Sequence, residues 1–86
     1  MGLFKVELEE VKTMPYDYSR LIGRIIGKFR TQARFAEALG LSERSVSLKL
    51  NGKVPWKQPE ISKACQVLDI KSVDIPSYFF VVEVQD

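Results

Sequence analysis

"LGLSERSVSLKLNG", residues 39–52, reads as a short polar helix that is entered through a glycine and a serine. Only Gly40, Leu41 and Ser42 separate it from a preceding helix pattern that begins after Thr31. A link this short makes two helices cross steeply instead of lying side by side. Gly40 can take a positive φ at the corner, which would cost a residue with a side chain about 1–2 kcal/mol. Ser42 can accept a hydrogen bond from a free amide at the start of the next helix.

The helix after the corner, expected over residues 43–51, has an apolar and a polar side. At 100° per residue, Val46 and Leu50 fall together on the apolar side. The side that faces away carries Arg44, Ser47, Leu48 and Asn51. Ala36, four residues before Gly40, leaves room for this helix to approach. The arrangement is that of a helix-turn-helix, which presents its second helix to the major groove of DNA.

Further elements flank this pair. Apolar residues at three- and four-residue spacing predict helices from Asp17 or Ser19 to Phe29 and over about 59–68, and alternation predicts a strand over 3–8. After Ile70 two alternatives stay open, a helical turn over 74–80 or a strand over 78–84, and the aromatic and β-branched residues favour a strand at least over 80–84. The predicted fold is one mainly α domain of four to five helices with a short terminal β element near 3–8 and 80–84. Its parts are a leader (1–14), a helical core (17–70) containing the motif 31–52, and a C-terminal turn and strand (71–86).

Composition excludes several classes of function. The 86 residues include no histidine and one cysteine, Cys65, which rules out an internal disulfide and a Cys/His zinc site. Cys65 is expected to pack as a small core residue. No apolar run approaches the length of a membrane span, and the glutamates before Met14 are unlike a signal peptide. We therefore expect a cytoplasmic protein without a metal, a cofactor or a membrane partner. Without histidine, a carboxylate pair in a recognisable pocket or a glycine-rich phosphate loop, we expect no enzyme activity.

Charge is unevenly distributed along the chain. Residues 15–57 contain nine basic and three acidic residues, whereas both flanks carry more acidic than basic residues. This distribution suggests a polyanionic partner for the middle of the chain. A solvated charged surface is the alternative interpretation.

The segment TQARFAEALGLSERSVSLKLNG, residues 31–52, resembles the helix-turn-helix of phage Cro and cI repressors and their bacterial XRE relatives, and above all small Cro/cI-like phage regulators. The likeness extends from about residue 16 to 80. It is carried by the residues Thr31, Gln32, Ala36, Gly40, Leu41, Val46, Asn51 and Gly52. The resemblance implies a lambda-repressor-like domain and a phage or prophage transcriptional repressor that binds double-stranded DNA sequence-specifically. Lys49 departs from the pattern, because most relatives have an apolar residue there. Either the helix is rolled, or Lys49 lays its stem along the core and its charge outward.

Base contacts are expected from the recognition helix. Arg44 can bind guanine through two hydrogen bonds, Ser47 can contact a base or a phosphate, and Leu48 can touch a thymine methyl group. Glu43 can accept from cytosine or complement the helix dipole. By resemblance, the DNA backbone contacts are Gln32, Thr31, Asn51, Lys53 and Lys57, although Thr31 is first of all a helix cap. Trp56 is interpreted as a core residue in preference to a contact.

A domain this small reads few base pairs, so specific repression calls for a homodimer on a palindromic operator. The hydrophobic stretch 79–84 is the candidate dimer strand, because it needs an edge to pair with. Three pairings stay open: with residues 3–8 of its own chain, with a second molecule as in Cro, or with both. The competing interpretation is a protein-interaction module, antitoxin-like or antirepressor-like, that reuses the fold without reading DNA. In addition, Glu9, Glu10 and Val11 are what a translated ribosome-binding sequence would encode, so the native start could be Met14.

Overall fold

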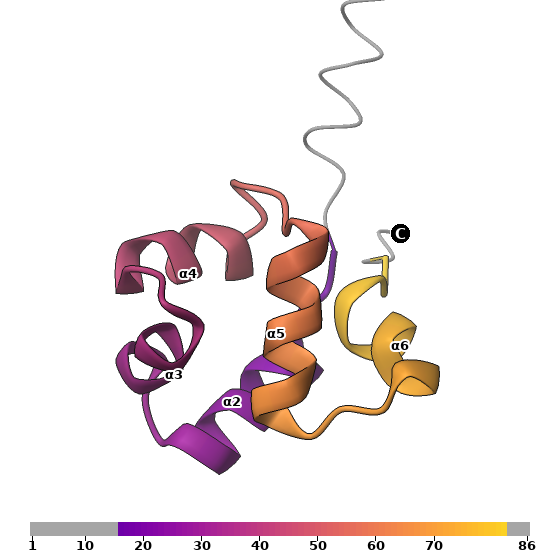
Figure 1. Cartoon of the computed structure of the whole chain (residues 1–86). Helices are drawn as coiled ribbons and strands as arrows, with labels where there is room; N and C mark the ends of the chain where they lie inside the picture. Colours follow the sequence, from indigo (N-terminus) through magenta and orange to yellow (C-terminus); the bar gives the residue numbers. More distant parts are fainter. Residues whose placement is uncertain (1–15, 83–86) are drawn as a thin grey trace, which may run out of the picture.

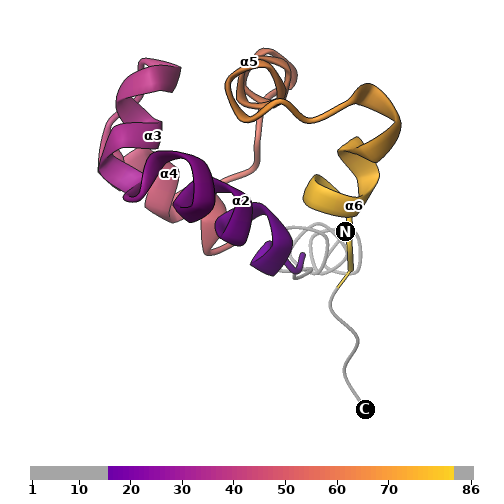
Figure 2. The ribbon, with the colours of Figure 1, turned by 90° about the horizontal axis from the view of Figure 1, so that it is seen from below.

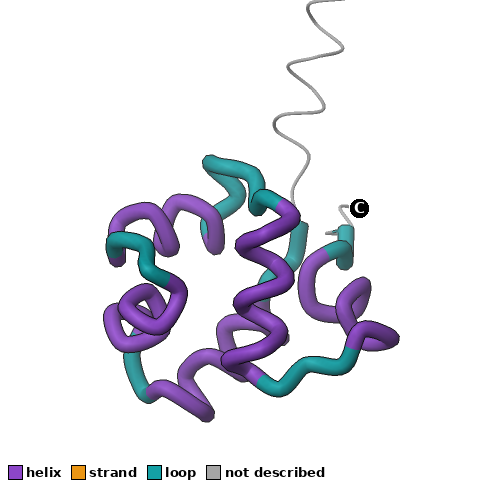
Figure 3. Tube along the Cα trace, viewed as in Figure 1, coloured by secondary structure: helices purple, strands orange, loops and turns teal. Residues whose placement is uncertain are grey.

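The computed structural model describes residues 16–82, which form five α-helices and one 3-10 helix (Figure 1). The helices are α2 (Ser19–Phe29), α3 (Gln32–Leu39), α4 (Glu43–Leu50), α5 (Gln58–Leu68), η1 (Ser72–Asp74) and α6 (Ile75–Phe79). No strand occurs between residues 16 and 82, where helices alternate with loops (Figure 3). The prediction of a mainly α fold with four to five helices is therefore confirmed.

Helix α5 stands between the α3–α4 pair and the C-terminal helix α6 (Figure 1). A view nearly along α5 shows α3 and α6 on opposite sides of it (Figure 2). Helix α3 packs against α2, α4 and α5, while α6 packs against α2 and η1. The largest fully buried side chains are Phe35, Phe79, Leu21, Ile25, Leu68 and Val46. One continuous core thus joins all five α-helices, and Cys65 belongs to it.

Helix α2 begins at Ser19, where the carboxylate of Asp17 accepts hydrogen bonds from the Ser19 backbone N–H and hydroxyl. These two hydrogen bonds lower the pKa of Asp17 and outweigh desolvation, which would raise it. Helix α5 begins at Gln58, one residue earlier than predicted.

The prediction of a strand over residues 80–84 is wrong for its described part. The helical alternative holds instead, because Pro76 favours the first turn of a helix and Tyr78 and Phe79 then turn into the core. The Phe80 N–H donates to the Pro76 carbonyl at 3.0 Å, so it is not available to a sheet. The only β pairing among residues 16–82 is an isolated antiparallel bridge between Tyr16 and Val82. The predicted strand 3–8, and residues 83 and 84, lie outside the described residues.

Candidate functional site

The α3–α4 pair is shaped by the backbone conformation of Gly40 and by a side-chain cap at the start of each helix. Gly40 has a φ of 76° and a ψ of 24°, the left-handed conformation that glycine adopts without steric cost. The Thr31 hydroxyl accepts from the Arg34 N–H at 3.1 Å, and the Ser42 hydroxyl accepts from the Ser45 N–H at 3.1 Å. Ala36 and Val46 are both buried, at 1% and 0% exposure, so the two helices approach closely. The corner holds α4 at the edge of the domain (Figure 1).

Only part of the outer side of α4 is exposed to solvent. Glu43 and Arg44 are exposed, whereas Ser47 and Leu48 are half-buried. The Asn51 side-chain amide donates to the Ser47 carbonyl at 2.9 Å and to the Ser47 hydroxyl at 3.3 Å. Asn51 therefore caps its own helix, and its donors are already used in this conformation. The side chains that α4 presents to a partner are chiefly one cation and one anion on adjacent residues.

The position of Lys49 differs from both alternatives that the sequence left open. Its side chain is buried, at 4% exposure, and it lies on the same side of α4 as Val46 and Leu50. The helix is not rolled, and the charge does not point outward. The ammonium forms an ion pair with Glu60 at 3.0 Å and donates to the Pro55 carbonyl at 3.1 Å. It also lies 5.9 Å from the centre of the Trp56 ring.

The carboxyl group of Glu60 is stabilised in its charged form. Burial opposes its ionisation, but hydrogen bonds from the Lys57 backbone N–H and the Lys49 ammonium outweigh burial and hold the pKa of Glu60 below its ordinary value. The Lys57 N–H reaches the Glu60 carboxylate at 2.9 Å. Lys49, Pro55 and Glu60 thus tie the end of α4, the following loop and the start of α5 together.

Four of the nine basic residues between 15 and 57 have intramolecular partners. Arg20 lies over the Tyr78 ring at 4.6 Å, and Arg24 donates to the Leu68 and Asp69 carbonyls at 2.9 and 3.0 Å. Lys28 pairs with Asp69 and lowers the pKa of that carboxyl, and Lys49 pairs with Glu60.

Eight of the nine basic residues between 15 and 57 are exposed, and helices α3 and α4 also carry exposed acidic residues. Besides Arg20, Arg24 and Lys28, which make the contacts described above, the exposed basic residues of this region are Arg30, Arg34, Arg44, Lys53 and Lys57. The exposed acidic residues of α3 and α4 are Glu37 and Glu43. Gln32, the predicted phosphate contact, is the half-buried first residue of α3. Lys49 is therefore the one basic residue of this region that is withdrawn from the described surface.

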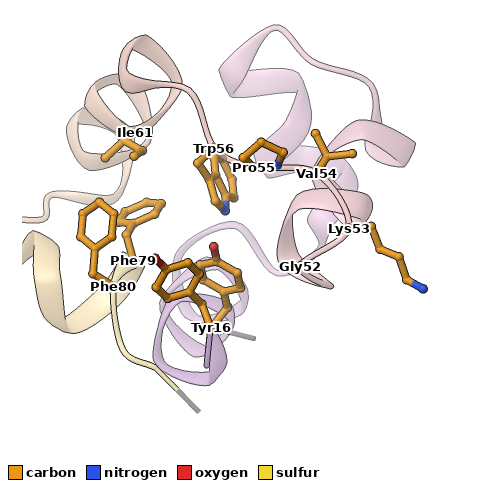
Figure 4. Close-up of a pocket in the computed structure, with 10 residues that line it drawn as sticks. Tyr16, Gly52, Lys53, Val54, Pro55, Trp56, Ile61, Phe79 and Phe80 are labelled. Carbon is orange, nitrogen blue, oxygen red and sulfur yellow. The ribbon is translucent and has the colours of Figure 1, made fainter. Parts of the chain in front are cut away.

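An apolar cavity of about 600 Å³ lies beside the loop that follows α4 (Figure 4). Its lining includes Trp56, Phe79 and Phe80, together with Tyr16 at the start of the described chain. Trp56 packs edge-on against Phe79, with ring centres 5.4 Å apart, and Tyr16 packs edge-on against Phe80 at 6.3 Å. Trp56 is a half-buried part of the core, as predicted.

Sequence reasoning missed this cavity. The aromatic pairs near residues 16–18 and 79–80 were visible as a signal, but the second pair was assigned to a strand. Beside the cavity, Tyr16, Phe80, Val81 and Val82 form an exposed apolar patch, with exposures between 37% and 51%. Within residues 16–82, no helix is long and apolar enough to cross a membrane.

The described part of the chain is a small helical domain that combines the α3–α4 corner with an exposed apolar patch. The chain belongs to the family described as "Protein of unknown function (DUF739)", whose model matches residues 14–82. It is also similar to the solution structure of the modulator of repression (MOR) of the temperate bacteriophage TP901-1 from Lactococcus lactis. That match has a TM-score of 0.70 and 57% sequence identity, and it covers 85% of this chain and 99% of the other. No curated protein matches the chain.

Proposed function

We propose that this chain is a phage or prophage regulator that modulates repression by binding a repressor protein. The observation that carries the proposal is the 57% identity to a phage modulator of repression over 99% of that protein's length. Because the match extends over nearly the whole of that protein, a related mode of action is the simplest inference. The role requires no catalysis, metal or cofactor.

Two features of the surface support a protein partner. Lys49, a basic residue of the helix expected to face DNA, is buried and binds Glu60 and the Pro55 carbonyl within the domain. The exposed apolar patch of Tyr16, Phe80, Val81 and Val82 is the kind of surface that marks protein contacts. Phosphate contacts supply much of the affinity for DNA, whereas clustered aromatic side chains are enriched in protein interfaces.

The test uses the purified repressor encoded by the phage or prophage that carries this gene. Isothermal calorimetry without DNA is expected to show a complex of defined stoichiometry, and the complex is expected to bind operator DNA with an affinity different from that of the repressor alone. The chain alone is expected to bind operator and unrelated DNA equally weakly. An absence of repressor binding, together with no effect on operator affinity, would contradict the proposal.

Direct reading of DNA by residues 43–51 is the second candidate, favoured by the capped corner at Gly40 and Ser42 and by the exposure of Arg44. A homodimer would then read a palindrome, and about six neutralised phosphates would give a log-log salt slope near −5. Arg44→Ala is expected to weaken specific binding by about 1–3 kcal/mol. Lys63→Ala, which removes an exposed charge from α5, is the matched control. Equal affinities of the two variants would exclude Arg44 as a base contact.

A further inference from the structure

The cavity next to the α4–α5 loop contains an unpaired hydrogen-bond donor. The indole N–H of Trp56 is buried and has no acceptor within the described part of the chain. Figure 4 shows the nitrogen end of the ring directed into the space between the Phe79–Phe80 pair and the loop from Gly52 to Pro55. A buried tryptophan N–H usually finds a partner, and leaving it unpaired is costly. The cavity is therefore incomplete without an acceptor.

The chemistry of the cavity defines its occupant. A volume of about 600 Å³ with an aromatic lining suits two or three large apolar side chains. The donor additionally requires an oxygen that is free to accept. The carbonyl groups inside a helix are bound within that helix, whereas an extended segment has carbonyl groups free along its edge. The cavity thus favours an extended apolar segment over an amphipathic helix.

The charges around the opening of the cavity indicate which residues should flank the bound segment. Lys53 lines the cavity, and Lys57 follows Trp56 directly; both are exposed. Figure 4 shows the Lys53 side chain extending outward from the mouth, where it can meet a carboxylate in solvent. The Glu60 carboxylate on the same side is already paired with Lys49. Acidic residues flanking the apolar segment complement this rim.

We propose that the groove formed by Tyr16, Trp56, Phe79, Phe80 and the loop before Trp56 binds an extended apolar segment of the protein partner, flanked by acidic residues, with one main-chain carbonyl accepting from Trp56. The inference rests on the proposed function, since it names the chemistry of the partner. The exposed patch of Phe80, Val81 and Val82 continues the apolar surface beyond the groove.

The test follows the indole N–H of the only tryptophan in the chain, which gives a single indole signal in a ¹H–¹⁵N spectrum. The full chain is titrated with the probe peptide acetyl-Glu-Leu-Val-Leu-Glu-amide. The indole proton signal is expected to move downfield saturably, because a carbonyl now accepts from it. Two control peptides carry serines in place of the apolar residues, or lysines in place of the glutamates. The serine peptide is expected to cause no shift, and the lysine peptide to bind about fivefold more weakly at low salt.

Variants of the chain test whether the probe peptide binds in the groove. Phe80→Ala changes an exposed side chain and is expected to weaken probe binding about fivefold. Val73→Ala, which changes a more exposed apolar side chain outside the groove, is expected to leave probe binding unchanged. Trp56→Phe keeps a ring but removes the donor, and the backbone signals of Gly52 and Lys53 are expected to report about fivefold weaker binding, the ratio that one net hydrogen bond gives. A circular dichroism melt confirms that each variant is folded.

Other occupants give distinct results. If the indole signal of the full chain is already downfield and moves upfield in a chain that begins at Met14, the leader fills the groove and the proposal is overturned. If the indole signal depends on protein concentration, a second copy of the chain fills the groove, and the proposal is likewise overturned. An indole signal that does not respond to the probe also overturns the proposal. Calorimetry with the repressor separates the two ideas: repressor binding that Phe80→Ala leaves intact refutes the groove alone, whereas no repressor binding refutes the proposed function.

Discussion

Replacing Lys49 by methionine tests whether the buried charge stabilises the domain. Methionine matches the length of the lysine stem and restores the apolar character usual at this position, but it removes both contacts of the ammonium, to Glu60 at 3.0 Å and to the Pro55 carbonyl at 3.1 Å. The Glu60 carboxylate, with 18% of its side chain exposed, keeps only the Lys57 N–H at 2.9 Å. Breaking a fully buried ion pair costs about 3–5 kcal/mol. Since Glu60 is partly solvated, we expect Lys49→Met to lower the free energy of unfolding by about 2 kcal/mol at pH 7.

The assay is urea unfolding followed by circular dichroism, with the double variant Lys49→Met/Glu60→Gln as control. Removing both charges leaves no unpaired carboxylate, so the double variant is expected within about 1 kcal/mol of the wild type. A Lys49→Met variant as stable as the wild type at pH 7 would refute the reasoning.

The same pair sets a pH dependence. The folded-state pKa of Glu60 lies below its ordinary value, so the stability that Glu60 contributes is present above its unfolded pKa of about 4.5 and is lost as the pH falls through the lower folded value. Lys49→Met removes the hydrogen bond and the charge of Lys49, both of which lower the pKa of Glu60, so this pKa rises in the variant. The stability difference between wild type and variant is therefore expected to shrink as the pH is lowered from 7 towards 4. A difference that stays constant over this range would show that Glu60 is not the group responsible.

Further predictions concern the backbone and the thiol. Gly27→Ala in α2 is expected to raise the free energy of unfolding by about 0.5–1 kcal/mol, because a Cβ there meets no atom within 4 Å and alanine is the better helix former; an unchanged melting curve would contradict this. Gly40→Ala is expected to cost about 1–2 kcal/mol despite the open space around it, because its φ is positive; a neutral effect in the same assay would show that the corner has relaxed. Cys65 is buried, and burial raises the pKa of its thiol. Its reaction with a thiol reagent at pH 7 is therefore expected to follow unfolding, and a fast reaction in the native protein would disprove the placement.

The helical corner could be predicted from the sequence because its causes are local. Thr31, Gly40 and Ser42 each act on backbone groups within four residues, so their roles follow from residue type and spacing. The C-terminal region could not be predicted in this way. Its aromatic and β-branched residues favour a strand, but the start at Pro76 and the burial of Tyr78 and Phe79 against the core favour a helix. Tertiary packing overrode local preference there.

Lys49 shows a second limit of sequence reasoning, since both of its partners lie beyond the helix that carries it. An apolar residue at this position would fill the same space, but it would leave the Pro55 carbonyl and the Glu60 carboxylate without their cation. Because Pro55 immediately precedes Trp56, the lysine holds the loop that positions the indole ring. The charge at this apolar position thus connects the helix-turn-helix corner to the groove. It follows that Lys49→Met should disturb the indole N–H signal of Trp56 more than Gly40→Ala does, although both variants are destabilised.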